Sequence, residues 1–151
     1  MSVEVQITVD CSHPGVLVDF WAPLLGYVLE PPPAGAASWN EHWLRVGVPE
    51  TELDPDRDNA DSVVDPAGVG PRIWFQVVPE AKQVKNRLHL DLRVGGARDD
   101  PVEQRRRRVE DRAQELVRAG ATYVRSLDTP TMPDYYAVTM LDPEGNEFCL
   151  R

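Results

Sequence analysis

Residues 86–94 read Asn-Arg-Leu-His-Leu-Asp-Leu-Arg-Val, and the interpretation of the whole chain starts from this stretch. Apolar and polar side chains alternate along it, which is typical of a β-strand with one buried face. The apolar set, from Leu88 to Val94, is expected in a core. The polar set places His89 and Asp91 between two arginines, which makes this face a candidate for function. A lone histidine on a sheet also fits an ordinary hydrogen-bonded surface residue.

The elements around this stretch form an internal repeat. Alternation predicts four strands in each half, at 3–9, 27–30, 38–48 and 73–78, and then at 86–94, 122–126, 135–141 and 146–150. An amphipathic helix follows the first strand of each half. The first helix has Ser12 as its expected N-cap, Pro14 in its first turn and Gly26 at its end. The second has Asp100, Pro101 and Gly120 in the same roles. The order βαβββ therefore occurs twice, with a period of about 70 residues.

This repeat predicts an α+β fold in which a single domain, residues 1–151, is made of two modules. The modules cover about 1–79 and 86–151, and a linker at 79–86 joins them. Residues 50–72 show no periodicity and are rich in Asp, Pro and Gly, so we expect a surface loop there, with a lid as the alternative.

Composition limits the classes of partner. The formal charge is −9 and the pI is near 4.7, which argues against nucleic acid and anionic membrane surfaces as partners. The chain has no apolar run of the roughly 18 residues that a membrane span needs, and its start lacks a basic and then apolar leader. We therefore expect a cytoplasmic protein, in which a disulfide between the two cysteines is improbable.

Three motifs resemble those of a known family. They are Asp19-Phe20-Trp21 with Leu24-Leu25-Gly26-Tyr27, then Val78-Pro79-Glu80 leading to residues 85–92, and the closing Asp142-Pro143-Glu144-Gly145-Asn146-Glu147-Phe148-Cys149-Leu150. Together they span nearly the whole chain. The chain is similar to a glyoxalase-like domain of the glyoxalase, bleomycin-resistance and dioxygenase group, also called the vicinal oxygen chelate superfamily.

The resemblance implies a curved, cup-like mixed sheet of paired βαβββ modules that encloses a small organic ligand, and it implies a homodimer. In metal-dependent members, His and Glu side chains from the first and last strands of each module hold a divalent ion. Carried over position by position, His89 matches the fifth-strand ligand, and Glu4 falls near the first-strand position. The usual last-strand glutamate falls on Cys149, with Glu147 two residues earlier.

A metal site of Glu4, His89 and Glu147 would form if these three side chains converge. The fourth-strand position offers Gln76 or Trp74, and the last-strand position offers Cys149. Such a mixed set is not the one that Mg²⁺, Mn²⁺ or Fe²⁺ prefers. The cofactor is therefore either a divalent metal (Fe, Mn, Ni or Zn) or, as the departures from the family pattern favour, none.

The same cup can also bind a ligand without a metal, because aromatic walls with a few placed polar groups are typical of small-molecule pockets. The residues expected to contact the ligand are Gln6, Trp39, Trp43, Gln76, Asp91, Tyr136 and Cys149. If chemistry occurs, His89 and Glu147 are the candidate catalytic residues.

Two functions follow as hypotheses. The first is a binding or resistance-type protein for a small organic ligand, or an uncharacterised enzyme of this superfamily. The alternative is a divalent-metal-dependent lyase, isomerase or dioxygenase. The sequence leaves open whether the chain is an enzyme.

Overall fold

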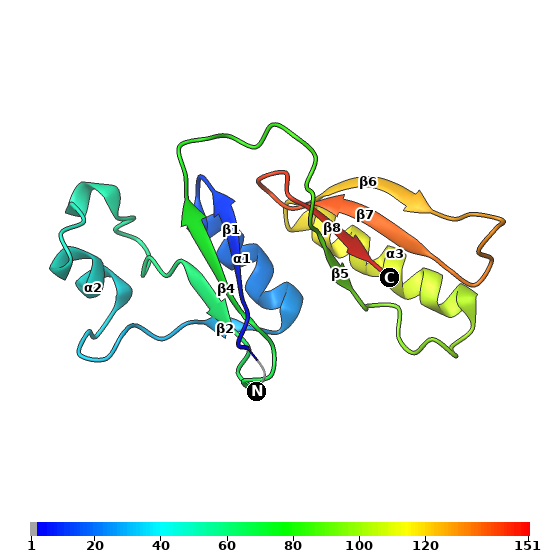
Figure 1. Cartoon of the computed structure of the whole chain (residues 1–151), viewed down its shortest axis with the longest axis horizontal. Helices are drawn as coiled ribbons and strands as arrows, with labels where there is room; N and C mark the ends of the chain where they lie inside the picture. The colour runs from blue at the N-terminus through cyan, green and yellow to red at the C-terminus, as the bar shows by residue number, and fades with distance from the viewer. Residues whose placement is uncertain (1–2) are drawn as a thin grey trace. The chain divides into compact units, whose positions relative to one another are not determined.

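The computed structural model describes residues 3–151 and divides the chain into two compact units, one running to Ala81 and the other from Lys82 to Arg151 (Figure 1). This boundary falls inside the predicted linker at 79–86. Each unit holds one four-stranded mixed sheet and one long helix, which confirms the predicted α+β fold of two modules. Among the helices of residues 3–151, none has the length and apolar character needed to cross a bilayer.

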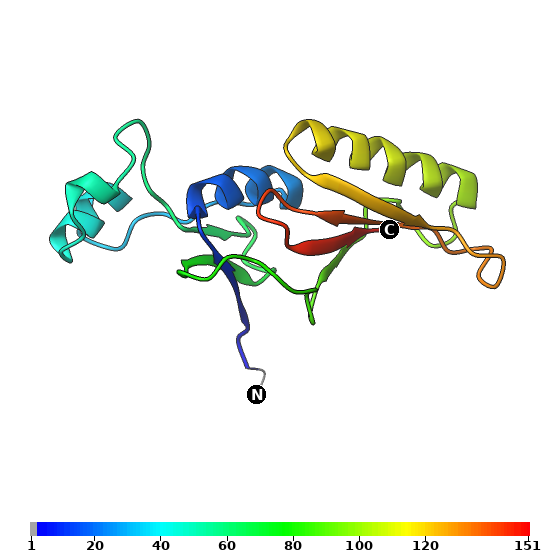
Figure 2. The same cartoon turned by 90° about the horizontal axis from the view of Figure 1, so that it is seen from above.

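The first unit contains seven elements. They are β1 (Gln6–Cys11), α1 (Pro14–Leu25), β2 (Val28–Leu29), α2 (Trp39–Arg45), the short 3-10 helix η1 (Glu50–Glu52), β3 (Ser62–Val64) and β4 (Arg72–Val77). Its sheet has the order β1-β4-β3-β2, in which β1 and β4 are parallel and the other neighbours are antiparallel. In Figures 1 and 2, α2 lies to one side of this sheet, away from α1.

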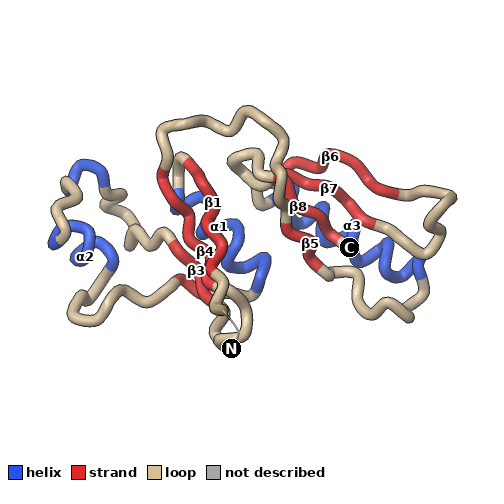
Figure 3. The backbone as a smooth tube through the Cα atoms, viewed as in Figure 1, coloured by secondary structure: helices blue, strands red, loops and turns tan. Residues whose placement is uncertain are grey.

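The second unit repeats this arrangement without the insertion. Its elements are β5 (Leu90–Leu92), α3 (Val102–Arg118), β6 (Thr122–Leu127), β7 (Ala137–Leu141) and β8 (Glu147–Leu150). The sheet order β5-β8-β7-β6, with β5 and β8 parallel, matches the first unit strand for strand. Figure 3 shows α3 running along one face of the four strands.

Each sheet buries one face against its helix. In the second unit, Val109, Ala113 and Leu116 of α3 are buried, and the strands contribute fully buried side chains at Val138, Met140, Phe148 and Leu150. In the first unit, α1 contacts β3 and β4, where Val63, Ile73 and Phe75 are buried. Because side chains alternate along a strand, the residues between these form the opposite, more polar face.

The residues that begin and end the two long helices agree only in part with the prediction. Pro14 begins α1, and Gly26, in the left-handed conformation at φ 70°, ends it as predicted. The residue at the N-cap is His13 rather than Ser12. In the second unit Pro101 is itself the N-cap, so α3 begins one residue later than expected.

The predicted strand at 38–48 is wrong, because this segment is the helix α2. Ser38 is its N-cap and its Oγ accepts a hydrogen bond from Glu41 N at 3.0 Å, while the Glu41 carboxylate accepts one from Ala37 N at 2.6 Å. The first bond is that of a capping box, while the Glu41 carboxylate reaches one residue beyond the N-cap, to Ala37 N. Together they outweigh the alternating pattern of this segment. The third strand of the module is instead β3, inside the region 50–72 for which we expected a loop without secondary structure.

The strand predicted over 86–94 is shorter than expected. Only Leu90–Leu92 is a strand, and Leu88 is 76% exposed rather than part of the core. The reason lies in the side chain of Asn86, whose Oδ1 accepts a hydrogen bond from Glu147 N at 3.2 Å. If β5 were longer, the Glu147 N–H of β8 would instead bond to a backbone carbonyl of β5.

The placement of α2 leads to a stability prediction. The Asp58 carboxylate accepts hydrogen bonds from Trp39 N (3.0 Å) and Asn40 N (2.8 Å), the first free N–H groups of α2. We expect Asp58→Ala to lower the free energy of unfolding by about 1 kcal/mol, as the loss of a helix cap does. Urea unfolding followed by circular dichroism measures this, with Asp56→Ala on the same loop as a matched control. Equal stability of the two variants would contradict the capping role.

Candidate functional site

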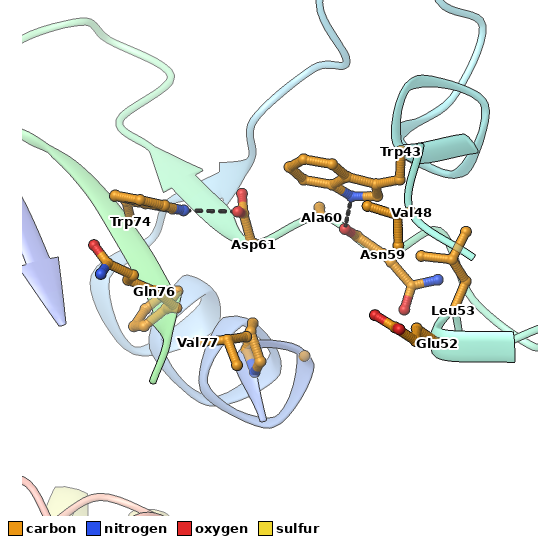
Figure 4. A pocket seen from close by; sticks show the side chains of 13 residues that line it. Trp43, Val48, Glu52, Leu53, Asn59, Ala60, Asp61, Trp74, Gln76 and Val77 are labelled. Atoms are coloured by element: carbon orange, nitrogen blue, oxygen red, sulfur yellow. Dashed lines mark hydrogen bonds between the residues drawn. The ribbon is translucent and has the colours of Figure 1, made fainter. Parts of the chain in front are cut away.

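A hollow of about 450 Å³ opens in the first unit beside α2 (Figure 4). We call it the α2 pocket. The lining side chains used below are Trp43, Glu52, Asn59, Asp61, Trp74 and Gln76. Its size lies within the range of about 300 to 1,000 Å³ that is usual for small-molecule sites. The α2 pocket is therefore large enough for a small organic ligand.

The wall on the α2 side is fixed by two stacked tryptophans. Trp39 and Trp43 have ring centroids 5.3 Å apart and planes inclined by 28°. The Trp43 Nε1–H donates to the Asn59 carbonyl oxygen at 2.8 Å, and the Trp39 Nε1–H donates to that of Glu30 at 2.7 Å. Trp39 is buried behind Trp43, so it supports the wall while Trp43 lines the hollow.

The opposite wall comes from the polar face of the sheet. Trp74 and Gln76 alternate with Phe75 along β4, so both belong to the face that α1 does not cover. The Trp74 Nε1–H donates to Asp61 Oδ2 at 2.6 Å. This bond holds the Trp74 ring and the Asp61 carboxylate in fixed positions, which is how a binding site keeps its shape before the ligand arrives.

A network of polar side chains occupies the other end of the same face. Arg72 pairs with Glu30 at 2.5 Å and donates to Gln6 Oε1 at 2.9 Å, and the Ser62 hydroxyl donates to Glu30 Oε2 at 2.6 Å. Gln6 is thus tied to Arg72 and does not line the α2 pocket. We read this network as structural, because its groups satisfy one another.

The second unit carries a different group on its polar face. Ligand atoms of His89, Asp91 and Cys149 all lie within 4.8 Å of one another, and we call these three residues the His89 cluster. His89 Nε2 is 3.4 Å from Asp91 Oδ1. Asp91 and Cys149 are direct partners in the β5–β8 register, and Thr139 of β7 is the next partner across. The β5–β8 register therefore positions Asp91 and Cys149, and His89 directly precedes β5.

Glu147 lies beside this cluster but is already paired. Its Oε1 is 2.5 Å from Lys85 Nζ. The Lys85 ammonium lowers the pKa of the Glu147 carboxyl below its usual value, and the charge of His89 acts in the same direction. A metal ion at Glu147 would have to displace Lys85.

The His89 cluster fits a borderline divalent ion such as Zn²⁺. Imidazole, carboxylate and thiolate are all ligands that zinc takes, and the three ligand atoms lie within 4.8 Å of one another. Burial raises the pKa of the Cys149 thiol, and the nearby carboxylates of Asp91 and Glu147 add to that shift. A bound metal would therefore have to release a proton from Cys149.

The structure brings together only part of the predicted site. Asp91 and Cys149 lie with His89 in the second unit, and Trp43 and Gln76 line the α2 pocket in the first. Glu4 precedes β1 and is exposed. Tyr136 is buried, with its hydroxyl bonded to Glu110 of α3 and the Arg106 guanidinium over its ring.

Several residues with a role in these sites were not predicted. Glu52, Asn59 and Asp61 line the α2 pocket, and they come from the region 50–72 that we expected to be a loop. The motif Ser38-x-x-Glu41 was the available indication of α2, since it is the sequence signature of a capping box.

Comparisons with known proteins agree with this architecture. A family model described as "Glyoxalase-like domain" matches residues 6–151. No curated protein matches the sequence closely enough to count as a relative.

Solved structures share the fold at low identity. A glyoxalase/bleomycin resistance protein/dioxygenase family enzyme from Burkholderia phytofirmans is 16% identical with a TM-score of 0.55, covering 96% of this chain and 94% of its own. A superfamily member from Sphaerobacter thermophilus is 18% identical (TM-score 0.53; 99% and 96% covered). A mutant of the fosfomycin resistance protein FosX from Listeria monocytogenes, complexed with Mn(II) and 1S,2S-dihydroxypropylphosphonic acid, is 9% identical (TM-score 0.58; 100% and 90% covered).

The pairing of Lys85 with Glu147 can be tested by titration. Because Lys85 lowers the pKa of Glu147, we expect Lys85→Ala to raise that pKa toward the value of an ordinary glutamate. The pKa of Glu147 can be measured by NMR, from the chemical shift of its side-chain carboxyl carbon between about pH 2 and pH 7. The matched control is Lys82→Ala, because the Lys82 ammonium donates to the Val84 carbonyl instead. An unchanged Glu147 titration in Lys85→Ala would refute the pairing.

Proposed function

The chain belongs to the glyoxalase-like domain family, and from that membership and the α2 pocket we propose that it binds a small organic molecule. The observation that supports this function is the pocket itself, with an indole ring on each side and carboxylate and amide groups between them. Two of the predicted ligand-binding residues, Trp43 and Gln76, would contact the ligand there. Trp39 would act from behind, through its stacking on Trp43.

The family resemblance also supports a homodimer, and the two buried cysteine thiols fit a reducing compartment such as the cytoplasm. Both are parts of the same proposal. Such a protein either only sequesters its ligand, as a resistance-type protein does, or converts it.

The second candidate function is metal-dependent chemistry as a lyase, isomerase or dioxygenase, and the His89 cluster is the observation that favours it. The ligands proposed are His89, Asp91 and Cys149, in place of the set Glu4, His89 and Glu147 that we expected. The fold neighbour FosX is complexed with Mn(II), which makes a metal reasonable for this fold. A thiolate ligand favours Zn²⁺ or Fe²⁺ over Mn²⁺ here. Such an ion would supply a Lewis acid for a substrate oxygen.

Binding at the α2 pocket is tested with a library of planar aromatic fragments that includes 2-naphthylmethanol, screened by saturation-transfer NMR. We expect fragments that compete with one another, and we expect Trp43→Ala to weaken them by about 1 kcal/mol, the usual worth of an aromatic contact beyond its area. Leu44→Ala is the matched control, because Leu44 is the next residue of α2 and is exposed. A library without hits, or hits that are insensitive to Trp43→Ala, would refute the proposed function.

Metal binding is tested on metal-free protein by calorimetry with Zn²⁺ and by absorption spectroscopy with Co²⁺. The Co²⁺ spectrum contains a charge-transfer band when a thiolate coordinates the ion. We expect one ion per chain, loss of binding in His89→Ala, and affinity that rises with pH because Cys149 must lose its proton. His42→Ala, which changes a histidine on α2, serves as the control. If the Co²⁺ spectrum lacks the thiolate band, the cluster is not the metal site.

A further inference from the structure

We propose that the ligand of the α2 pocket is an organic cation, with a protonated amine or quaternary ammonium group attached to an aromatic or otherwise apolar body. This inference rests on the proposed function, since it names the chemical class of the molecule that the pocket binds. It follows from the charges, the hydrogen-bonding groups and the ring positions of the lining residues.

The charge of the lining is negative. Among residues 3–151, the side chains that line the α2 pocket include two acidic groups, Glu52 and Asp61, and no lysine or arginine. Figure 4 shows the Glu52 carboxylate turned toward the hollow from η1, across from Asp61. Two carboxylates at one hollow repel an anionic ligand and attract a cationic one.

Arg57 is the basic residue to consider nearby, because its guanidinium packs against Gly15, one of the lining residues. Both of its terminal nitrogens bond to the Asp19 carboxylate, at 2.9 and 3.1 Å. A bidentate pair of this kind neutralises the charge of the arginine. Arg57 therefore does not offset Glu52 and Asp61.

The hydrogen-bonding groups are mainly acceptors. Asp61 Oδ2 takes the Trp74 indole N–H, and within residues 3–151 its Oδ1 takes no hydrogen bond. The amide nitrogen of Asn59 is occupied, because it donates to Asn40 Oδ1 at 2.7 Å and to the Asp54 carbonyl at 3.0 Å. A ligand that donates hydrogen bonds, as an ammonium does, therefore fits better than one that accepts them.

The two indoles lining the pocket complete the argument. Both N–H groups are used inside the protein, Trp43 on the Asn59 carbonyl and Trp74 on Asp61, so neither ring offers its polar edge to a ligand. The rings lie on either side of Asp61 in Figure 4. The Trp74 N–H meets Asp61 in the plane of its ring, so a cation at Asp61 would be held by the carboxylate and not by the face of that indole. The apolar body of the ligand would lie against the same rings.

The test uses three probes of the same shape and different charge: 2-naphthylmethylammonium, 2-naphthylmethanol and 2-naphthoate. Calorimetry on the full chain in low salt should rank the ammonium tightest, about fivefold tighter than the alcohol, which is the usual effect of partly exposed ion pairs with two carboxylates. The naphthoate should bind weakest. The preference of ammonium over alcohol should shrink in 0.5 M salt (roughly a 4 Å screening length), because salt screens exposed charges.

Two variants locate the effect. We expect Glu52→Gln and Asp61→Asn each to reduce the ratio of ammonium to alcohol affinity by about twofold. Glu50→Gln is the matched control, because Glu50 belongs to the same turn, η1, but does not line the pocket. Glu52→Gln remains informative if Asp61→Asn disturbs Trp74, since Glu52 is exposed.

The outcomes separate the two proposals. If the alcohol or the naphthoate binds as tightly as the ammonium, and Trp43→Ala weakens it, the pocket binds organic molecules but the inferred charge is wrong. If the ammonium is preferred equally in Glu52→Gln, Asp61→Asn and the wild type, the carboxylates do not select the ligand. If no probe and no library fragment binds, the proposed function itself fails.

Discussion

A single helix can cover only one face of a four-stranded sheet, and the candidate chemistry of this protein depends on that constraint. In each unit the covered face holds the large apolar side chains, such as Phe75 under α1 and Phe148 under α3. The other face has no helix of its own and can carry polar groups without losing core packing. The His89 cluster and the Trp74 wall of the α2 pocket both belong to such faces.

The two units share a topology but have diverged in what they add to it. The second unit keeps short connections and gathers its ionisable groups along one row of cross-strand partners, from Asp91 to Thr139. The first unit inserts α2 and η1 between β2 and β3 and so gains a wall that the sheet alone cannot supply. A repeat of βαβββ therefore carries a pocket in one copy and a cluster of residue types that can bind metals in the other.

The strands and long helices could be predicted because their periodicity is set by burial on one side. The neighbouring placement of His89 and Asp91 was predicted for the same reason, since alternation put them on one face and their side chains do lie 3.4 Å apart. The error at 38–48 arose where two patterns coincide. Trp39, Glu41 and Trp43 alternate as in a strand, while Ser38 caps the helix by accepting from Glu41 N. Asp58 also stabilises the helix from far along the chain, and single-sequence periodicity does not register such a contact. The pocket residues near position 60 were missed because loop residues show no period at all.

The attachment of α2 has a consequence for how such proteins can change. Its carboxylate cap and its tryptophan wall are anchored to residues of the same insertion, at Asp58 and Asn59, rather than to the buried face of the sheet. The insertion is therefore stabilised by contacts among its own residues, including those that shape one wall of the α2 pocket. Substitutions in this insertion can therefore reshape the lining of the α2 pocket while the duplicated scaffold and the His89 cluster stay as they are.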